Sequence, residues 1–131
     1  MPNGQKKGKV NRMAVDQDSL WKELLDRWLR QFLAFFFPQI EREINWARRP
    51  EFLDKEFQKI ARDSALGKRL ADKLVKVWLA SGEEAWLLIH IEVQGHPERS
   101  FSVRMYQYNY RIFDRYGREV ISLAVLTERR T

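Results

Sequence analysis

The chain has 131 residues, of which 44% are hydrophobic and 32% charged, an ordinary composition for one soluble globular domain with a real core. It contains no cysteine, which excludes disulfides, thiolate metal sites and a cysteine nucleophile and suits the reducing cytoplasm, where we expect the protein to lie. The formal net charge of +6 suggests a polyanionic partner.

Much of that charge lies at the start of the chain. We expect residues 1–17 to form a basic, disordered tail, because they are rich in cations and poor in apolar side chains. The four cations that would add salt-sensitive affinity for a nucleic-acid backbone are Lys6, Lys7, Lys9 and Arg12. A terminus that serves only solubility is the alternative interpretation. The chain after Arg12 has 20 basic and 18 acidic residues, so the body is nearly neutral.

The most apolar stretch, "QFLAFFFPQI", is too short to span a bilayer and contains Pro38, so no membrane partner is expected. The phenylalanines of "FLAFFFP" exceed what one small core needs. They predict an exposed aromatic surface through which two copies of the chain would form a homodimer.

From Asp18 the sequence predicts a helix, with an apolar stripe on one side and charge pairs on the other. Pro38 ends this helix, since proline disfavours helical backbone at the residue before it. "QIEREINWARRPEF" (39–52) is then expected to be a polar connector. "FLDKEFQKI" (52–60) is interpreted as a strand, although its apolar positions do not alternate cleanly.

"LADKLVKVWLA" (70–80) alternates better and predicts a second strand. "SGEE" (81–84) predicts a tight hairpin turn, and "AWLLIHIEVQ" (85–94) predicts a third strand rich in branched aliphatic residues. The two strands should therefore pair in antiparallel fashion.

After the turn "GHPERS", Ser100 or Ser102 is expected to cap a second helix, which Gly117 would end. Its apolar stripe consists of Phe101, Met105, Tyr108, Ile112 and Tyr116. Its polar stripe consists of Arg104, Gln107 and Arg111. "EVISLAVLTE" (119–128) is continuously apolar and predicts a strand deep inside the sheet. We expect residues 18–131 to form a single domain.

Three polar side chains share one face of the third predicted strand: His90, Glu92 and Gln94. The hairpin brings Asp72 roughly opposite residue 93. Two carboxylates at a strand end are costly to bury unless something neutralises them, and Mg²⁺ prefers such oxygen ligands. The alternatives are an aspartate at a strand edge and a Glu-x-Gln pair on a solvent face. His90 itself is expected to be a core residue whose polar atoms have partners.

Three stretches carry a resemblance to a known family: "FLDKEFQKIA", "ADKLVKVWLASGEEAWLLIHIEVQG" and "RMYQYNYRIFDRYG". They resemble the recombination-promoting nuclease / putative transposase family of the PD-(D/E)XK nuclease superfamily, over roughly residues 18–127. The resemblance implies an α/β fold with a PD-(D/E)XK restriction-endonuclease-like core. That core consists of a helix, a three-stranded meander, a helix and a strand, with a mixed central sheet flanked by helices.

The implied activity is Mg²⁺-dependent hydrolysis of DNA phosphodiester bonds, with Mn²⁺ as an alternative ion and double-stranded DNA as the expected substrate. By resemblance, the metal ligands are Asp72, Glu92 and the backbone carbonyl of Val93. Gln94 stands where the superfamily more often has lysine. An amide can orient a water or a phosphate oxygen, but it supplies no positive charge.

The superfamily often draws a further acidic residue from its first helix, and Glu23 is the candidate, with Glu56 as a second. Glu23 is also placed to pair with Arg27 at i,i+4 spacing, which is the alternative interpretation. The polar stripe of the second helix, Arg104, Gln107 and Arg111, is expected either to contact DNA phosphates or to be a solvated face.

A function of another class remains open from the sequence. Gln94 departs from the superfamily pattern, and the chain ends soon after "AVLTERRT", whereas members of the resembling family generally continue. The alternative is therefore a catalytically inactive or truncated nuclease fold that acts as a DNA-binding or oligomerisation module.

Overall fold

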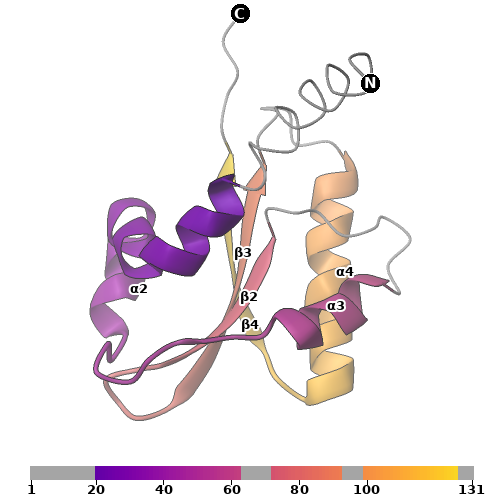
Figure 1. Ribbon diagram of the computed structural model, residues 1–131. Coiled ribbons are helices and arrows are strands. Elements are labelled where there is room, and N and C mark those ends of the chain that lie inside the picture. The colour runs from indigo at the N-terminus through magenta and orange to yellow at the C-terminus, as the bar shows by residue number, and fades with distance from the viewer. Residues whose placement is uncertain (1–19, 63–71, 93–98, 127–131) are drawn as a thin grey trace, which may run out of the picture.

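The computed structural model describes residues 20–62, 72–92 and 99–126. A four-stranded mixed sheet lies between two layers of helices (Figure 1). In chain order the elements are a first helix over 20–36, α2 (Pro38–Glu43), β1 (Glu51–Phe52), α3 (Asp54–Arg62), β2 (Lys73–Trp78), β3 (Glu84–Glu92), α4 (Arg99–Tyr116) and β4 (Val120–Leu126). The predicted α/β class, with a mixed sheet flanked by helices, is confirmed.

The strands follow the order β1-β2-β3-β4. The first three form an antiparallel meander, into which α3 is inserted between β1 and β2. β4 pairs in parallel with β3, and α4 makes the crossover that a parallel connection requires. The predicted tail, residues 1–17, lies outside the described residues.

Each face of the sheet has its own hydrophobic core. The first helix covers one face, where Leu25 and Leu33 pack on Val75 and Leu87. We call this the α2 side, because α2 lies on the same side in Figure 1. Helices α3 and α4 cover the other face, which we call the α4 side; there Phe57 and Tyr108 belong to the same core as Leu88. Because side chains alternate along a strand, neighbouring residues of β2 and β3 enter different cores.

The break after the first helix occurs where the sequence predicts it. The last helical residue is Phe36, and Pro38 occupies the first turn of α2, where its missing N–H group removes no helical hydrogen bond. The expected polar connector (39–52) is wrong in its first part, because residues up to Glu43 are helical.

The strand expected over 52–60 is also wrong, since α3 begins at Asp54. Its buried residues, Phe57, Ile60 and Ala61, recur at helical spacing and line a single face of α3. This period explains why the same residues failed to alternate cleanly as a strand.

The β2–β3 hairpin is confirmed, but its register differs from the expected one. Lys73 lies opposite Ile89 and Trp78 lies opposite Glu84. The turn contains three residues, 80–82, closed by a hydrogen bond from the N–H of Gly82 to the carbonyl of Leu79 (2.9 Å). Gly82 has φ of +95°, which suits glycine alone among common residues. Continuing this register brings Asp72 beside His90 rather than beside residue 93.

Helix α4 departs from expectation at its start. It is helical from Arg99, so Ser100 and Ser102 lie inside it and neither is its cap. Gly117 does follow its end, with φ of +65° and an N–H bond to the carbonyl of Phe113 (2.8 Å). β4 was expected deep inside the sheet, but among the described strands it has only β3 as a neighbour.

A buried lysine links the two helical layers. Lys73 is 1% exposed, and its Nζ lies 2.6 Å from a carboxylate oxygen of Asp26 in the first helix. The same Nζ lies 2.9 Å from Asp54, the first residue of α3. Both carboxylates are about half exposed, so the ammonium is the group that depends on the contact.

Replacing both acceptors of Lys73 is expected to destabilise the fold strongly. Asp26→Asn together with Asp54→Asn should lower the free energy of unfolding by about 3 kcal/mol, because the buried ammonium loses both counter-charges. Each single change should cost less than about 1 kcal/mol, since the other carboxylate remains. Urea unfolding measures all three. Adding Lys73→Met to the double variant should restore most of the loss, whereas additive single effects would contradict the shared role.

Candidate functional site

Three buried polar side chains meet on the α4 side of the sheet. The Oδ1 atom of Asp72 lies 3.2 Å from Nδ1 of His90, and Oδ2 lies 3.3 Å from Nε of Arg104. All three residues are at most 2% exposed. We call this group the Asp72 cluster. It joins the start of β2, the end of β3 and the first half of α4.

The sequence places each member by simple periodicity. Asp72 shares a face with Leu74 because strand side chains alternate, and His90 shares a face with Leu88 for the same reason. On α4, Arg104 and Tyr108 are one helical turn apart and both are buried. The cluster is therefore a polar end of the core that contains Leu74 and Leu88.

Aromatic rings hold the imidazole of His90 in place. Its ring is parallel to that of Tyr108, with centroids 6.0 Å apart and planes 1° apart. Phe57 of α3 meets the same tyrosine edge to face at 5.1 Å. The expectation that His90 is a core residue with partners is confirmed, and its partner is the aspartate that the sequence singled out for metal binding.

Arg104 occupies a position that the sequence did not predict. The stripe that contains it was expected to contact DNA or to be a solvated face, but Arg104 is 2% exposed and faces the sheet. Gln107 and Arg111 are half-buried. The charge of Asp72 is thus already compensated by a guanidinium. A metal ion is therefore not the only group that can neutralise a carboxylate at this end of the sheet.

Glu92 is the last residue of β3 and lies two residues beyond His90. Diagonal neighbours of this kind are about 7–8 Å apart between backbones, within reach of a shared ligand. The side chain of Glu92 lies outside the described residues, as do Val93 and Gln94. The four basic residues of the tail, Lys6, Lys7, Lys9 and Arg12, also lie outside them.

The two additional acidic candidates differ in position. Glu23 is exposed on the first helix, which covers the α2 side, and its carboxylate pairs with Arg27 at 3.5 Å. The structure therefore does not bring Glu23 to Asp72. Glu56 lies in the first turn of α3, the helix that packs on the α4 side, and its carbonyl accepts a hydrogen bond from the Tyr116 hydroxyl (3.5 Å).

The donor atoms on the α4 side suit a hard divalent cation in kind. Asp72 supplies carboxylate oxygens, and Glu92 would add a second carboxylate. Within the described parts of the chain, no group of three or more His, Cys, Asp or Glu side chains is close enough together to hold a metal ion. Because both oxygens of Asp72 contact a nitrogen, any ion there has to share them with His90 and Arg104.

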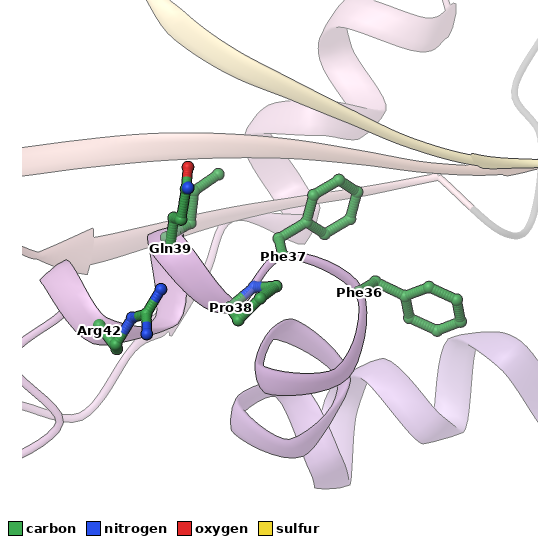
Figure 2. A pocket seen from close by; sticks show the side chains of 6 residues that line it. Phe36, Phe37, Pro38, Gln39 and Arg42 are labelled. Atoms are coloured by element: carbon green, nitrogen blue, oxygen red, sulfur yellow. The ribbon is translucent and has the colours of Figure 1, made fainter.

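A second candidate lies on the α2 side of the sheet. A pocket of about 380 Å³ opens where the first helix meets α2, lined by Phe36, Phe37, Pro38, Gln39, Ile40 and Arg42 (Figure 2). Nearby, the side chain of Phe35 is 78% exposed and that of Trp28 is 51% exposed. The predicted exposed aromatic surface is therefore present. The residues that line the pocket include one cation, Arg42, and no carboxylate. Such a lining suits apolar contact rather than cleavage of a phosphodiester bond.

No protein-family model, curated protein or solved structure matches the chain significantly. None of the helices in the described residues is both long enough and apolar enough to cross a membrane. The functional assignment therefore has to come from the sites themselves.

The Asp72 cluster makes Asp72 important for stability as well as for any chemistry. Asp72→Ala leaves the guanidinium of Arg104 buried without this counter-charge, so we expect the free energy of unfolding to fall by about 3–5 kcal/mol. Chemical denaturation followed by tryptophan fluorescence measures the loss. Adding Arg104→Met should recover a large part of it, and an equal or greater loss in the double variant would argue against the pairing.

Proposed function

We propose that the chain is a Mg²⁺-dependent DNA endonuclease domain with a PD-(D/E)XK-type core, linked to recombination or mobile elements. One observation supports the proposal: the carboxylate of Asp72, directly before β2, contacts His90 of the paired strand β3, and Glu92 ends that strand two residues later. Two carboxylates in that relation, at the end of a meander followed by a crossover helix, agree with the site that the family resemblance implies. Mn²⁺ would be accepted as a similar oxygen-preferring ion.

In this proposal Asp72 and Glu92 hold the ion, with the backbone carbonyl of Val93 as a third oxygen ligand. The bound ion supplies a more acidic water and charge stabilisation for hydrolysis. The chain contributes orientation: Arg104 and His90 fix the carboxylate of Asp72, and Gln94 positions the water or a phosphate oxygen. The reaction proceeds by direct hydrolysis, with no covalent intermediate on the protein.

The substrate follows from charge. The net charge of +6 favours a polyanion, and the basic residues of the tail would add affinity that does not depend on sequence. Gln107 and Arg111, on the same helix as Arg104, are the half-buried side chains that would contact the DNA backbone. Double-stranded DNA is therefore the proposed substrate.

A second function has its own supporting observations. The oxygens of Asp72 lie 3.2 Å from a nitrogen of His90 and 3.3 Å from one of Arg104, so its charge is compensated without an ion. The exposed aromatic surface around Phe35 and Trp28 suits contact between copies of the chain. The alternative proposal is accordingly a catalytically inactive nuclease fold that serves as a DNA-binding or oligomerisation module.

Plasmid nicking with and without Mg²⁺ separates the two proposals. Glu92→Gln is the sharper variant, because Asp72 also holds Arg104 in the core. We expect Glu92→Gln to lower the nicking rate at least about 100-fold, since removal of a metal-binding carboxylate forfeits several kcal/mol of charge stabilisation. The circular dichroism spectrum of the variant should stay unchanged.

Glu83→Gln is the matched control, because Glu83 is an exposed carboxylate at the opposite end of the same hairpin. Its nicking rate should equal that of the unaltered protein. If Glu92→Gln nicks as fast as this control, the assignment of the site is wrong. Binding of DNA without any metal-dependent nicking favours the alternative function instead.

A further inference from the structure

Helix α4 lies against the sheet with one side and turns its other side outward (Figure 1). Tyr108 and Ile112 belong to the inner side and are fully buried. The outward side of a surface helix normally carries charged and polar residues. In α4 it carries four exposed apolar or aromatic side chains, which we call the outer row: Val103, Tyr106, Tyr110 and Phe113.

The outer row has the spacing of a contact between two helices. Its members follow one another at intervals of three, four and three residues, the alternation by which one helix packs along another. Each helical residue adds about 1.5 Å, so the row runs along one side of α4 for about 15 Å. None of its four members is charged. A regular apolar row of this kind indicates a partner helix.

The order of the row favours a second copy of the chain as that partner. The intervals are the same when they are counted from either end, so two antiparallel copies of α4 bring row against row. At each end Val103 of one copy then faces Phe113 of the other, a small side chain against a large one. In the middle Tyr106 faces Tyr110, and a two-fold axis repeats that contact. Parallel helices would instead crowd two Phe113 rings at one end.

The charge beside the row also fits the antiparallel arrangement. A helix N-terminus favours negative charge, yet the first turn of α4, residues 99–102, contains no acidic residue. Asp114 is exposed next to the other end of the row. Antiparallel pairing places it near the first turn of the second copy, so each copy supplies the carboxylate that the other helix lacks.

The exposed area of the row is close to what a specific dimer needs. Its three aromatic residues are between 55% and 72% exposed, and Val103 is 43% exposed. An aromatic side chain buries about 150–250 Å² when it is fully covered, so the row leaves roughly 450 Å² open on each copy. Two paired rows and the side chains beside them would cover about 1,000–1,200 Å², the lower end of specific interfaces. Such a dimer is specific but weak.

We propose that two copies of the chain form a two-fold symmetric dimer by antiparallel pairing of their α4 helices along the outer row. The dimer does not depend on the nuclease function, because the row lies on the side of α4 that faces away from the sheet. It also differs from contact through Phe35 and Trp28, which belong to the first helix on the other face of the sheet.

Sedimentation equilibrium of the full chain tests the dimer. We expect a dissociation constant of about 10 µM, in keeping with the small interface. Tyr106→Glu should raise it at least about 100-fold, because the two-fold axis buries the unpaired carboxylate twice. Its circular dichroism spectrum should stay unchanged, since Tyr106 is exposed in the single chain. Tyr106→Ala removes the ring without adding a charge and should weaken the dimer about tenfold, which covers a failure of the charged variant to fold.

A second substitution tests the register. Adding Tyr110→Lys to Tyr106→Glu places opposite charges face to face twice in the antiparallel dimer, so dimerisation should recover at least about tenfold over Tyr106→Glu alone. In a parallel dimer like charges would meet, and no recovery would occur. Absence of recovery therefore overturns the antiparallel register.

Phe35→Glu is the matched control, since Phe35 is an equally exposed aromatic residue on the first helix. It should leave the dissociation constant unchanged. Loss of the dimer in Phe35→Glu but not in Tyr106→Glu would move the interface to the α2 side and overturn the proposal. A monomer at concentrations up to about tenfold above the expected dissociation constant overturns it as well. That holds even if Tyr106→Glu weakens DNA binding, which would assign the outer row to nucleic acid instead.

Discussion

Two adjacent charges on one central strand organise this fold. Asp72 and Lys73 are consecutive, so the alternation of strand side chains sends them to opposite faces of the sheet. Asp72 meets Arg104 on α4, while Lys73 meets Asp26 on the first helix and Asp54 on α3. Because neither buried charge is stable alone, each helix has to lie where its partner side chain can reach β2.

This constraint explains how both helical layers keep a defined position. Apolar contacts are tolerant of small shifts, because many arrangements of aliphatic side chains bury similar area. Ion pairs at about 3 Å are not, since the attraction and the hydrogen-bond geometry both weaken quickly with distance. The charges on β2 therefore select one arrangement among those that the two hydrophobic cores would permit. They do so at the end of the sheet where the proposed active site lies.

The sequence predicted correctly those helix ends and strands that depend only on residues close together in the chain. Pro38 ended the first helix, Gly117 followed α4, and alternation identified β2 and β3. The strand expected over 52–60 failed because α3 is amphipathic with a helical period, which a short window did not separate from imperfect alternation. These errors concern single elements and left the order of the sheet unaffected.

The register error had larger consequences for the site. The turn expected over 81–84 pairs Asp72 with residue 93, whereas the observed turn over 80–82 places Asp72 beside His90, on the other face of β3. The pairing of Asp72 with residue 93 was wrong, and the shared site of Asp72 and Glu92 stays a prediction. The length of the turn decides the register of a hairpin. The sequence "SGEE" marks a turn but does not fix how many residues the turn contains.

Arg104 could not be found from the sequence, because its partner lies in another element and only the folded chain brings them together. A polar stripe on a helix predicts equally well a solvated face, a ligand contact or a buried counter-ion. What distinguishes them is the charge that faces the stripe across the core. Here that charge is Asp72, a metal ligand in the proposed function. The guanidinium of Arg104 compensates the charge of Asp72 inside the fold whether or not an ion binds there. Stability and activity would then draw on the same carboxylate, so changes at Asp72 would be difficult to assign to either one without a compensating change at Arg104.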